Sequence, residues 1–581
     1  MGNWFVAAKR ADFEKIAETF GISPVLARLI RNRDVCGDEE IRKYLYGGVE
    51  DLYAPELLKG IDRAVAVIKK AIEEGRKIRV IGDYDIDGVC ATYILVRSLR
   101  SLGADVDMAI PHRIKDGYGL NDHLIEQAAA DRVELIVTCD NGIAAADQIE
   151  LAHRLGMQVV VTDHHEVPFT ESDAEGERAY HLPPAEAVID PKQPGETYPF
   201  SGICGAVVAW KLVWALGTDR RLLDALLEPA AFATVGDVME LKDENRIIVK
   251  EGLKRMRHTS NPGLRALIEV NELDMGKVDS YHIGFVLGPC VNASGRLESA
   301  ELSLKLWLEE DYGKAVPMAA RLKKLNDERK DMTETGVKQA VELLERKGLD
   351  KVLVPYLPDC HESLAGIIAG RIREKYNRPT IVLTDAEEGV KGSGRSIEGY
   401  DMFAHLSACK DLFRKFGGHK MAAGVSLERE NVEELRRRLN ENCPLTEEDF
   451  IPKVHIDIAL PLSYVSEGFM QELDLLAPFG NGNPKPVFAQ KNMLLQSGRI
   501  FGKNRNVVKF EAKDQQGVNH TLVCFKDVEE LEKFLAEKYG EDAGRLFSGG
   551  GVSLPFTFTY YPSLNEYRGK REIEFVITNY C

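Results

Sequence analysis

Ile78-Arg79-Val80-Ile81, continued by Gly82-Asp83-Tyr84-Asp85-Ile86-Asp87-Gly88, is the stretch that decides the fold. Its first four residues predict a short strand, and three carboxylates follow at alternate positions. A helix is predicted over residues 90–102, ended by Gly103. Further short apolar strands are predicted at 106–110, 135–138 and 158–162, with helical sequence between them. Short apolar strands that alternate with helices are typical of a parallel sheet covered on both faces.

Acidic and histidine residues directly follow three of these predicted strands. They are Asp83, Asp85 and Asp87, then Asp140-Asn141-Gly142, then Asp163-His164-His165. The carboxyl ends of parallel strands share one edge, where open α/β sheets bind ligands. If the chain stays extended, the first three carboxylates also point to one side. Asp237, an acid in an otherwise apolar run, is a fourth candidate.

Carboxylates and imidazoles from separate loops can converge on a divalent metal ion. No thiolate pattern competes, so the residues favour Mn²⁺ or Mg²⁺ over structural Zn²⁺. The alternative is that each aspartate is a helix cap or a turn residue, which is the commoner role of a single Asp after a strand. Three acid-rich strand ends in one sheet favour the metal site.

The rest of the chain changes in character along its length. Residues 1–50 predict a helical lead-in, 51–300 the first α/β domain, and 301–348 a connection dominated by one long helix. Residues 349–445 predict a second α/β domain with strands at 352–354 and 380–383. Alternating strands over 452–581 predict a small antiparallel barrel or sandwich.

Composition sets limits on the function. The 581 residues carry a net charge of −17, which argues against a protein coated with nucleic acid but leaves room for a local basic groove. No apolar run is long enough to cross a membrane, and the first residues do not resemble a signal peptide. The ten cysteines include no C-x-x-C, so we expect reduced thiols and a cytoplasmic protein.

Residues 481–513 form a basic segment, with seven basic residues and one acidic residue. Phe488, Phe501 and Phe510 are interleaved with these charges. Basic residues with stacking aromatics suit single-stranded nucleic acid, because every base offers a π-face. The alternative is a solvated strand face whose aromatic residues belong to the core.

Taken together, the motifs resemble those of the DHH phosphoesterase superfamily, which is named after its Asp-His-His triplet. The resemblance rests on residues 80–88, 140–142, 163–165 and 236–237, and on the glycine-rich loop Gly417-Gly418-His419-Lys420-Met421-Ala422-Ala423-Gly424. Ser393-Gly394-Arg395-Ser396 resembles the phosphate-binding set of the associated second domain. The segments 111–120 and 292–296 narrow the resemblance to the RecJ family of bacterial exonucleases. The fold class implied is a parallel-sheet DHH domain, a long helix, a second α/β domain (DHHA1) and an OB-type barrel.

The resemblance also implies roles for individual residues. It implies that two Mn²⁺ or Mg²⁺ ions are held by Asp85, Asp87, Asp140, His164 and Asp237. It implies a catalytic set of Asp83, Asp140 and His165, in which Asp83 orients the ligands and His165 contacts the scissile phosphate. The substrate-binding residues implied are Arg113, Arg296, Ser393, Arg395, Gly418 and His419 around a terminal phosphate, with Lys503 and Arg505 in the barrel.

The activity implied is 5′→3′ hydrolysis of single-stranded DNA in repair and recombination. The partners implied are single-stranded DNA, a single-stranded-DNA-binding protein and a RecQ-type helicase, for a monomer without membrane contact that works at the nucleoid. Two alternatives stay open. One is another DHH phosphodiesterase that acts on short oligonucleotides or RNA, and the other is a non-catalytic single-strand-binding replication factor.

Overall fold

The computed structural model describes residues 2–171, 178–502, 505–525, 528–549, 551–567 and 570–581. The chain divides into two compact units. The larger unit comprises Gly47–Thr446 and Gly480–Gly482, and the smaller unit comprises Met1–Tyr46, Glu447–Phe479 and Asn483–Cys581.

The first half of the larger unit alternates strands and helices and then becomes helical. Its elements are α4 (Ile61–Glu73), β2 (Ile78–Ile81), α5 (Ile86–Ser101), β3 (Val106–Ala109), α6 (Asp122–Ala130), β4 (Leu135–Cys139), α7 (Ala146–Arg154), β5 (Gln158–Thr162), β6 (Phe169–Glu171), β7 (Arg178–Tyr180), β8 (Ala187–Ile189), α8 (Gly205–Ala215), α9 (Arg220–Ala225), α10 (Leu227–Gly236), α11 (Asp243–Met256), α12 (Pro262–Val270), α13 (Ser280–His282), the π-helical turn η4 (Ile283–Leu287), α14 (Gly288–Leu297) and α15 (Glu301–Leu308).

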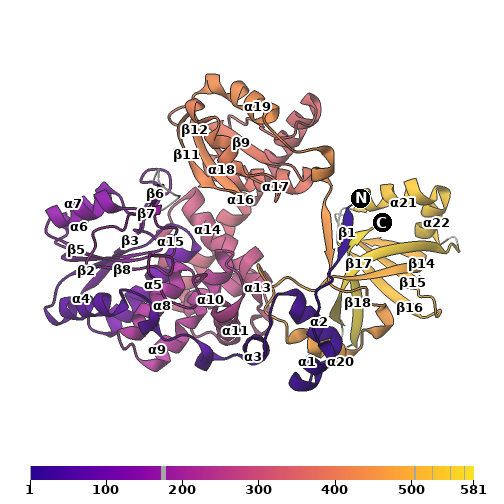
Figure 1. The fold of residues 1–581 in the computed structure, drawn as a ribbon, viewed down its shortest axis with the longest axis horizontal. Helices are drawn as coiled ribbons and strands as arrows, with labels where there is room; N and C mark the ends of the chain where they lie inside the picture. Colours follow the sequence, from indigo (N-terminus) through magenta and orange to yellow (C-terminus); the bar gives the residue numbers. More distant parts are fainter. Residues whose placement is uncertain (1, 172–177, 503–504, 526–527, 550, 568–569) are drawn as a thin grey trace. The chain divides into compact units, whose positions relative to one another are not determined.

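Five strands form a parallel sheet in the order β3-β2-β4-β5-β8 (Figure 1). Neighbouring residues of each strand face opposite sides: Val80 and Val137 pack with α4, α5 and α8, whereas Ile81 and Ile136 pack with α6 and α7. Both faces are therefore buried, and the predicted doubly covered parallel sheet is confirmed. β2, β4, β5 and β8 end side by side, so the residues after them share one edge.

The second half of the larger unit begins with a 36-residue helix, α16 (Tyr312–Lys347). It continues with α17 (Ala365–Tyr376), β9 (Thr380–Asp385), β10 (Val390–Arg395), α18 (Met402–Ser407), β11 (Phe413–His419), β12 (Ala422–Leu427) and α19 (Val432–Glu441). Its sheet is antiparallel in the order β11-β12-β10-β9. The strand predicted at 352–354 is wrong, because Leu353 makes only an isolated bridge with Thr380.

The smaller unit contains a closed five-stranded barrel in the order β14-β15-β16-β18-β17. Its elements are β1 (Asn3–Val6), α1 (Phe13–Phe20), α2 (Pro24–Asn32), α3 (Asp38–Tyr46), β13 (Lys453–Ile456), α20 (Glu467–Asp474), β14 (Phe488–Phe501), β15 (Val507–Lys513), β16 (Asn519–Cys524), α21 (Val528–Tyr539), α22 (Glu541–Ser548), β17 (Leu554–Tyr567) and β18 (Lys570–Tyr580). The lead-in predicted as helical also contains a strand, because β1 pairs in parallel with β13. The predicted barrel is confirmed.

The barrel corrects the role predicted for its aromatic residues. Phe488 and Phe510 are fully buried in the core of the smaller unit, so they cannot stack on a nucleic acid. Phe510 lies between Lys509 and Glu511 on a strand whose residues alternate between core and surface. On this strand Lys509 and Lys513 lie on the outward side of the alternation and Phe510 on the inward side, whereas Phe501, at the end of β14, is exposed.

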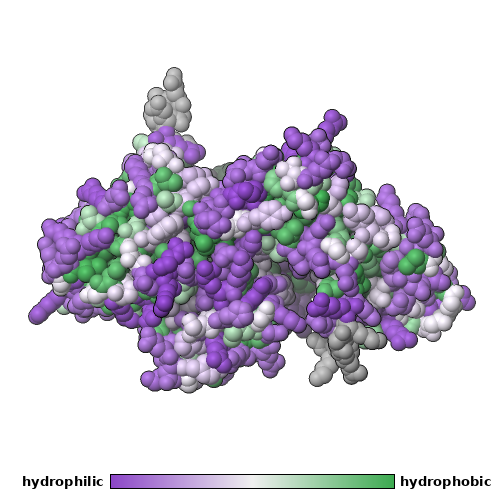
Figure 2. All heavy atoms as spheres, turned by 90° about the horizontal axis from the view of Figure 1, so that it is seen from below, coloured by the Kyte–Doolittle hydropathy of each residue, from purple (hydrophilic) through white to green (hydrophobic). Residues whose placement is uncertain are grey.

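The face shown in Figure 2 is mostly hydrophilic, with separate smaller hydrophobic patches. Seven of the ten cysteines are buried, and the described residues form no disulfide. Among the described residues, no helix is long and apolar enough to cross a membrane.

Candidate metal centre

The acidic residues after β2 sit on a strand-to-helix turn. Asp85 is the N-cap of α5, and its Oδ1 accepts hydrogen bonds from Asp87 N at 2.9 Å and Gly88 N at 3.1 Å. Asp87 therefore lies in the first helical turn, so the chain does not stay extended through the three carboxylates. The turn still leaves ligand oxygens of Asp83, Asp85 and Asp140 within 4.8 Å of one another.

Asp87 is anchored by the first turn of α8. Its Oδ2 accepts from Gly205 N at 2.6 Å, and its Oδ1 accepts from Ala206 N at 2.8 Å. A carboxylate is favoured there because the free N–H groups and the dipole of a helix N-terminus carry partial positive charge. A Cβ on Gly205 would lie 2.7 Å from Asp140 Cβ, so a glycine is needed for α8 to approach both aspartates.

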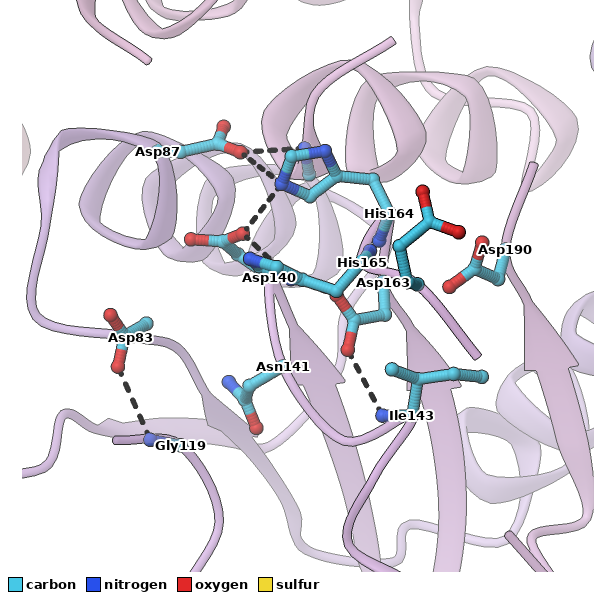
Figure 3. Close-up of polar contacts among 12 residues, drawn as sticks. Asp83, Asp87, Gly119, Asp140, Asn141, Ile143, Asp163, His164, His165 and Asp190 are labelled. Atoms are coloured by element: carbon cyan, nitrogen blue, oxygen red, sulfur yellow. Dashed lines mark hydrogen bonds and ion pairs between the residues drawn. The ribbon is translucent and has the colours of Figure 1, made fainter. Parts of the chain in front are cut away.

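His164 stands at the centre of the acidic residues. Its Nε2 lies 3.1 Å from Asp140 Oδ1, 3.5 Å from Asp87 Oδ2 and 3.9 Å from Asp237 Oδ2. Figure 3 shows the imidazole between Asp87 and Asp140, which come from different strand ends. Burial lowers the pKa of His164, which favours the neutral imidazole that binds metals. Ligand atoms of His164 and its neighbours form two further groups compact enough for an ion: Asp87, His164 and Asp237, and Asp140, His164 and His165.

Asp163 fixes the second histidine. Its Oδ1 accepts from His165 Nδ1 at 2.7 Å and from His164 N at 2.7 Å, and its Oδ2 accepts from Ile143 N at 2.9 Å. Burial alone would lower the pKa of His165, but the hydrogen bond and charge of Asp163 outweigh it and raise the pKa to about 9. His165 is therefore a cation at neutral pH, beside the metal-ligand candidates and partly open to solvent.

Nearby positive charges do not offset the burial of the remaining carboxylates. Burial and repulsion from neighbouring aspartates raise the pKa of both Asp83 and Asp237 to about 8. Burial also raises the pKa of Asp87 and Asp140. Asp140 Oδ1 is buried and receives no hydrogen bond from the part of the chain that the structure describes. Such a group is costly unless a cation joins it, and oxygen ligands with an imidazole fit Mn²⁺ or Mg²⁺.

The predicted phosphate-binding residues of the second domain lie on its sheet. Arg395 Nη1 donates to Ser393 Oγ at 3.0 Å on β10. A Cβ on Gly366 would lie 2.8 Å from Arg395 Nη2, so this pair sits against the first turn of α17. Gly418 and His419 belong to strand β11 rather than to the predicted loop, and β12 lies between them and β10.

Arg296 brings α14 into contact with the second domain. Its Nη1 donates to the carbonyl oxygen of Ser363 at 2.7 Å. Burial, together with the positive charges of Arg113 and Arg329, lowers the pKa of Arg296 to about 10. Arg113 stacks on the ring of Tyr84, 4.2 Å from its centroid. The structure therefore gathers Arg113 and Arg296 and adds Arg329, from α16, which the sequence did not single out.

The predicted barrel contacts are only partly described. Lys503 lies outside the described residues. Arg505 is exposed and lies 3.5 Å from a carboxylate oxygen of Glu532, and Lys509 Nζ lies 2.6 Å from Glu574 Oε1. A nucleic acid would have to compete with these acidic partners for both side chains.

Several residues of the site were missed. Asp163 was predicted to lie at the shared strand edge with the other acidic residues, but its role in holding His165 was not predicted. Tyr118 donates to the carbonyl oxygen of Asp140 at 2.9 Å. It lies in segment 111–120, which supported the family resemblance, but no role was predicted for Tyr118 itself. Gly205 and Arg329 carry no local signal, because their importance comes from contacts with residues far away in the chain.

Substituting Gly205 by alanine is expected to weaken divalent-metal binding about ten-fold or more, since changes next to metal ligands typically cost 10- to 100-fold. The added Cβ would push α8 away from Asp140 and lengthen the hydrogen bonds to Asp87. Calorimetric titration with Mn²⁺ would measure the loss. Gly544→Ala, a helical position with open space around it, is the control and should bind as the wild type does. An unchanged affinity of Gly205→Ala for Mn²⁺ would contradict the close contact between the start of α8 and Asp140.

Family models match three parts of the chain. The DHH family N-terminal domain matches residues 77–234, the DHHA1 domain matches 349–443, and the RecJ OB domain matches 456–579. Among solved structures, RecJ from Thermus thermophilus in complex with Mn²⁺ has a TM-score of 0.80 and 27% identity, covering 100% of this chain and 79% of that chain. A manganese-bound exonuclease RecJ has a TM-score of 0.58 and 31% identity, covering 68% of this chain and 98% of that chain.

Curated relatives extend over most of the sequence. The single-stranded-DNA-specific exonuclease RecJ of Bacillus subtilis is 39% identical over 87% of this chain, which spans only 64% of that longer protein. The RecJ proteins of Dickeya dadantii and Escherichia coli are 35% and 33% identical, and the matches cover 95% and 96% of both partners. The chain therefore belongs to the RecJ family of single-stranded-DNA-specific exonucleases.

Proposed function

We propose that this chain hydrolyses single-stranded DNA from its 5′ end with two divalent ions, Mn²⁺ or Mg²⁺, in DNA repair and recombination. The observation that carries the proposal is the convergence of Asp87, Asp140, His164 and Asp237 around one point, with too little positive charge to balance them. The Thermus relative, crystallised with Mn²⁺ and with Mg²⁺, supports the choice of ions.

In this proposal Asp85, Asp87, Asp140, His164 and Asp237 hold the ions. Asp140 is the candidate shared ligand, because its oxygens take part in two of the three compact groups. Bound ions would polarise the phosphate and lower the pKa of water to about 7. Asp83 takes part in one of those groups and accepts from Gly119 N at 3.3 Å, so we assign it to orienting the ligands.

His165 is assigned to the scissile phosphate. Its Nδ1 donates to Asp163, and its Nε2 lies 3.3 Å from the Tyr118 hydroxyl, so a phosphate oxygen would share this edge of the positively charged ring with Tyr118. A charge-assisted hydrogen bond of this kind strengthens as negative charge develops on the phosphate. Asp163 would then be a positioning residue, which sets the ring orientation and keeps the ring protonated.

The 5′ end is proposed to be sensed by Arg113, Arg296, Ser393, Arg395, Gly418 and His419. A terminal phosphate has more charge and more free oxygens than an internal one, and guanidinium groups, hydroxyls and backbone N–H groups can detect both. Ser393 and Arg395 support this assignment because they lie together at the first turn of α17, where N–H groups also favour an anion.

Arg395→Ala is expected to slow cleavage of 5′-phosphorylated strands about ten-fold or more, because a charge-assisted hydrogen bond contributes about 1.5–3 kcal/mol. Cleavage of 5′-hydroxyl strands should slow much less. Initial rates on the two substrates would measure the change in preference. Arg437→Ala, at an exposed arginine of α19, is the control. Equal slowing of both substrates would show that the end is sensed elsewhere.

Stabilisation by metal is expected to increase with pH between 6.5 and 8. Asp83 and Asp237 have folded-state pKa values of about 8, against about 3.9 in the unfolded chain, so the metal-free folded state binds the extra protons. Its stability must then fall as pH rises, by on the order of 1 kcal/mol per pH unit. His165, with a pKa of about 9, acts in the same direction.

A bound cation removes the destabilisation that the metal-free protein suffers as pH rises. The melting temperature in Mn²⁺ should therefore exceed the melting temperature in chelator by more at pH 8 than at pH 6.5. Oxygen-free buffers keep the manganese reduced. Asp237→Asn removes one of the titrating carboxylates and should flatten the pH dependence. A shift that is constant from pH 6.5 to 8 would contradict the assignment of these carboxylates to the metal centre.

Comparison of substrates separates the proposal from its alternatives. With Mn²⁺, single-stranded DNA should be degraded much faster than duplex DNA, single-stranded RNA or dinucleotides. Preference for dinucleotides or RNA would favour another DHH phosphodiesterase, and binding of single strands without release of nucleotides would favour a replication factor. We also propose, from the family alone, a monomer that works with a single-stranded-DNA-binding protein and a RecQ-type helicase.

A further inference from the structure

Two aromatic side chains of the larger unit are stacked on each other and exposed to solvent. Tyr281 belongs to α13 and Phe285 to the π-helical turn η4, and their ring centroids are 4.9 Å apart with an interplanar angle of 29°. Tyr281 is 57% exposed and Phe285 is 67% exposed. Adjoining exposed aromatic rings form a candidate binding surface, and π-helical turns are frequent at functional sites.

Val238 is a second exposed apolar residue in this region, and its backbone is strained. It follows Asp237 directly, has φ +58° and is 66% exposed. A β-branched residue rarely adopts the left-handed region, and such strain persists where the surrounding structure imposes it. Here the Val238 N–H donates to the carbonyl oxygen of Val235 at 3.2 Å, and its carbonyl oxygen accepts from Asn481 Nδ2 at 2.8 Å.

η4, which carries Phe285, packs on the end of α10, the helix that Val238 follows. Gly284 lies next to Phe285, and a Cβ on it would be 3.8 Å from Val235 Cγ1. α10 ends at Gly236, and Asp237 follows as its C-cap, with Oδ2 at 3.9 Å from His164 Nε2. The end of α10 therefore links η4, which carries Phe285, to Asp237, one of the metal-ligand candidates.

We propose that Tyr281 and Phe285 form a stacking platform for an unpaired base of the single strand bound at the metal centre, with Val238 at its edge. The inference rests on the proposed function. A strand whose phosphate reaches the ions must continue over the adjacent surface, and stacking on aromatic rings is how proteins hold unpaired bases of any sequence. In duplex DNA the faces of each base are already covered by its neighbours, so the platform would also favour single strands.

In this proposal bases stack on Tyr281 and Phe285 rather than on the barrel phenylalanines that were predicted from the sequence. Of the three phenylalanines expected to stack on bases, Phe488 and Phe510 are buried, and only Phe501 is exposed. Tyr281 and Phe285 lie in the larger unit, which also contains the metal-ligand candidates. A base bound there would lie in the same unit as the reacting phosphate, so loss of the platform should affect even short single strands.

The double variant Tyr281→Leu/Phe285→Leu tests the platform, because leucine retains an apolar side chain but removes the π-face. On a short single-stranded oligodeoxynucleotide we expect KM to rise about ten-fold while kcat changes little. Tyr281→Trp/Phe285→Trp should keep the wild-type KM. On an oligonucleotide whose internal nucleotides are abasic, wild type and leucine variant should have the same KM, because no base is present to stack.

Tyr312→Leu, which removes another exposed ring in the larger unit, is the matched control and should leave KM unchanged. A wild-type KM in the leucine double variant would overturn the platform and leave the proposed function standing. An equal rise of KM on normal and abasic strands would also overturn it, because the residues would then act on the backbone. Absence of single-strand hydrolysis by the wild type would remove the proposed function and the platform together.

Discussion

Replacing Asp140 by alanine is expected to abolish hydrolysis, with a loss of at least about 10²- to 10³-fold, the range seen when one buried group that stabilises developing charge is removed. Asp140 contributes to two of the three ligand groups and lies 3.1 Å from His164 Nε2, which belongs to the third group, so its loss removes a ligand from two of the three candidate ion positions. Steady-state release of nucleotides at saturating Mn²⁺ is the measurement.

The same change should not unfold the metal-free protein. Asp140 is a buried carboxylate whose charge is opposed by its neighbours, so alanine relieves repulsion while removing a ligand. We expect an unchanged or higher melting temperature in chelator and a smaller increase with Mn²⁺. Asp147→Ala, an exposed acid in the first turn of α7, is the control for loss of a carboxylate. Residual activity above a few per cent would exclude Asp140 as a metal ligand.

Replacing Lys211 by methionine is expected to lower the free energy of unfolding by about 3–5 kcal/mol, because it leaves a buried carboxylate without its cation. Lys211 and Glu244 are fully buried, with Nζ at 2.8 Å from Oε2, and Tyr198 donates to the other oxygen of Glu244. Denaturant unfolding of the metal-free protein would measure the loss. Lys305→Met, which breaks an exposed pair with Glu301, should cost no more than about 1 kcal/mol.

This ion pair also bears on the metal centre. Lys211 lies on α8, whose first two N–H groups hold Asp87. In Lys211→Met/Glu244→Gln no buried charge is left unpaired, so much of the lost stability should return, and Mn²⁺ binding should recover with it. If the double variant were no more stable than Lys211→Met, the loss would have to come from packing around Lys211 rather than from the unpaired Glu244.

The parts of the fold that follow local rules could be predicted from the sequence. The parallel sheet was predictable because each of its main strands is a short apolar run, and the acidic residues after β2, β4 and β5 had to share an edge once the sheet was parallel. The detailed geometry of Asp85 and Asp87 was not predictable in this way. Asp85 caps α5 immediately, and an Asp-x-Asp pattern does not reveal whether a helix starts within it.

Features that depend on distant contacts escaped prediction. The approach of Gly205 to Asp140 joins residues far apart in the chain, and Arg329 looked like one more charge on a solvated helix. The exposure of Phe285 and the strained backbone of Val238 carry no local signal either. The buried Phe510 was predictable in principle, since Lys509, Phe510 and Glu511 alternate as a half-buried strand should.

Digestion of one single-stranded oligodeoxynucleotide, labelled at either its 5′ or its 3′ end, tests the central claim most directly. With Mn²⁺ we predict that the 5′ label is released as a mononucleotide from the first turnover, while the 3′ label stays on a strand that shortens progressively. A blunt duplex carrying the same labels should be degraded far more slowly, and chelator or Asp140→Ala should stop release from the single strand. Earlier release of the 3′ label, equal attack on the duplex, or release that persists in chelator would contradict the account.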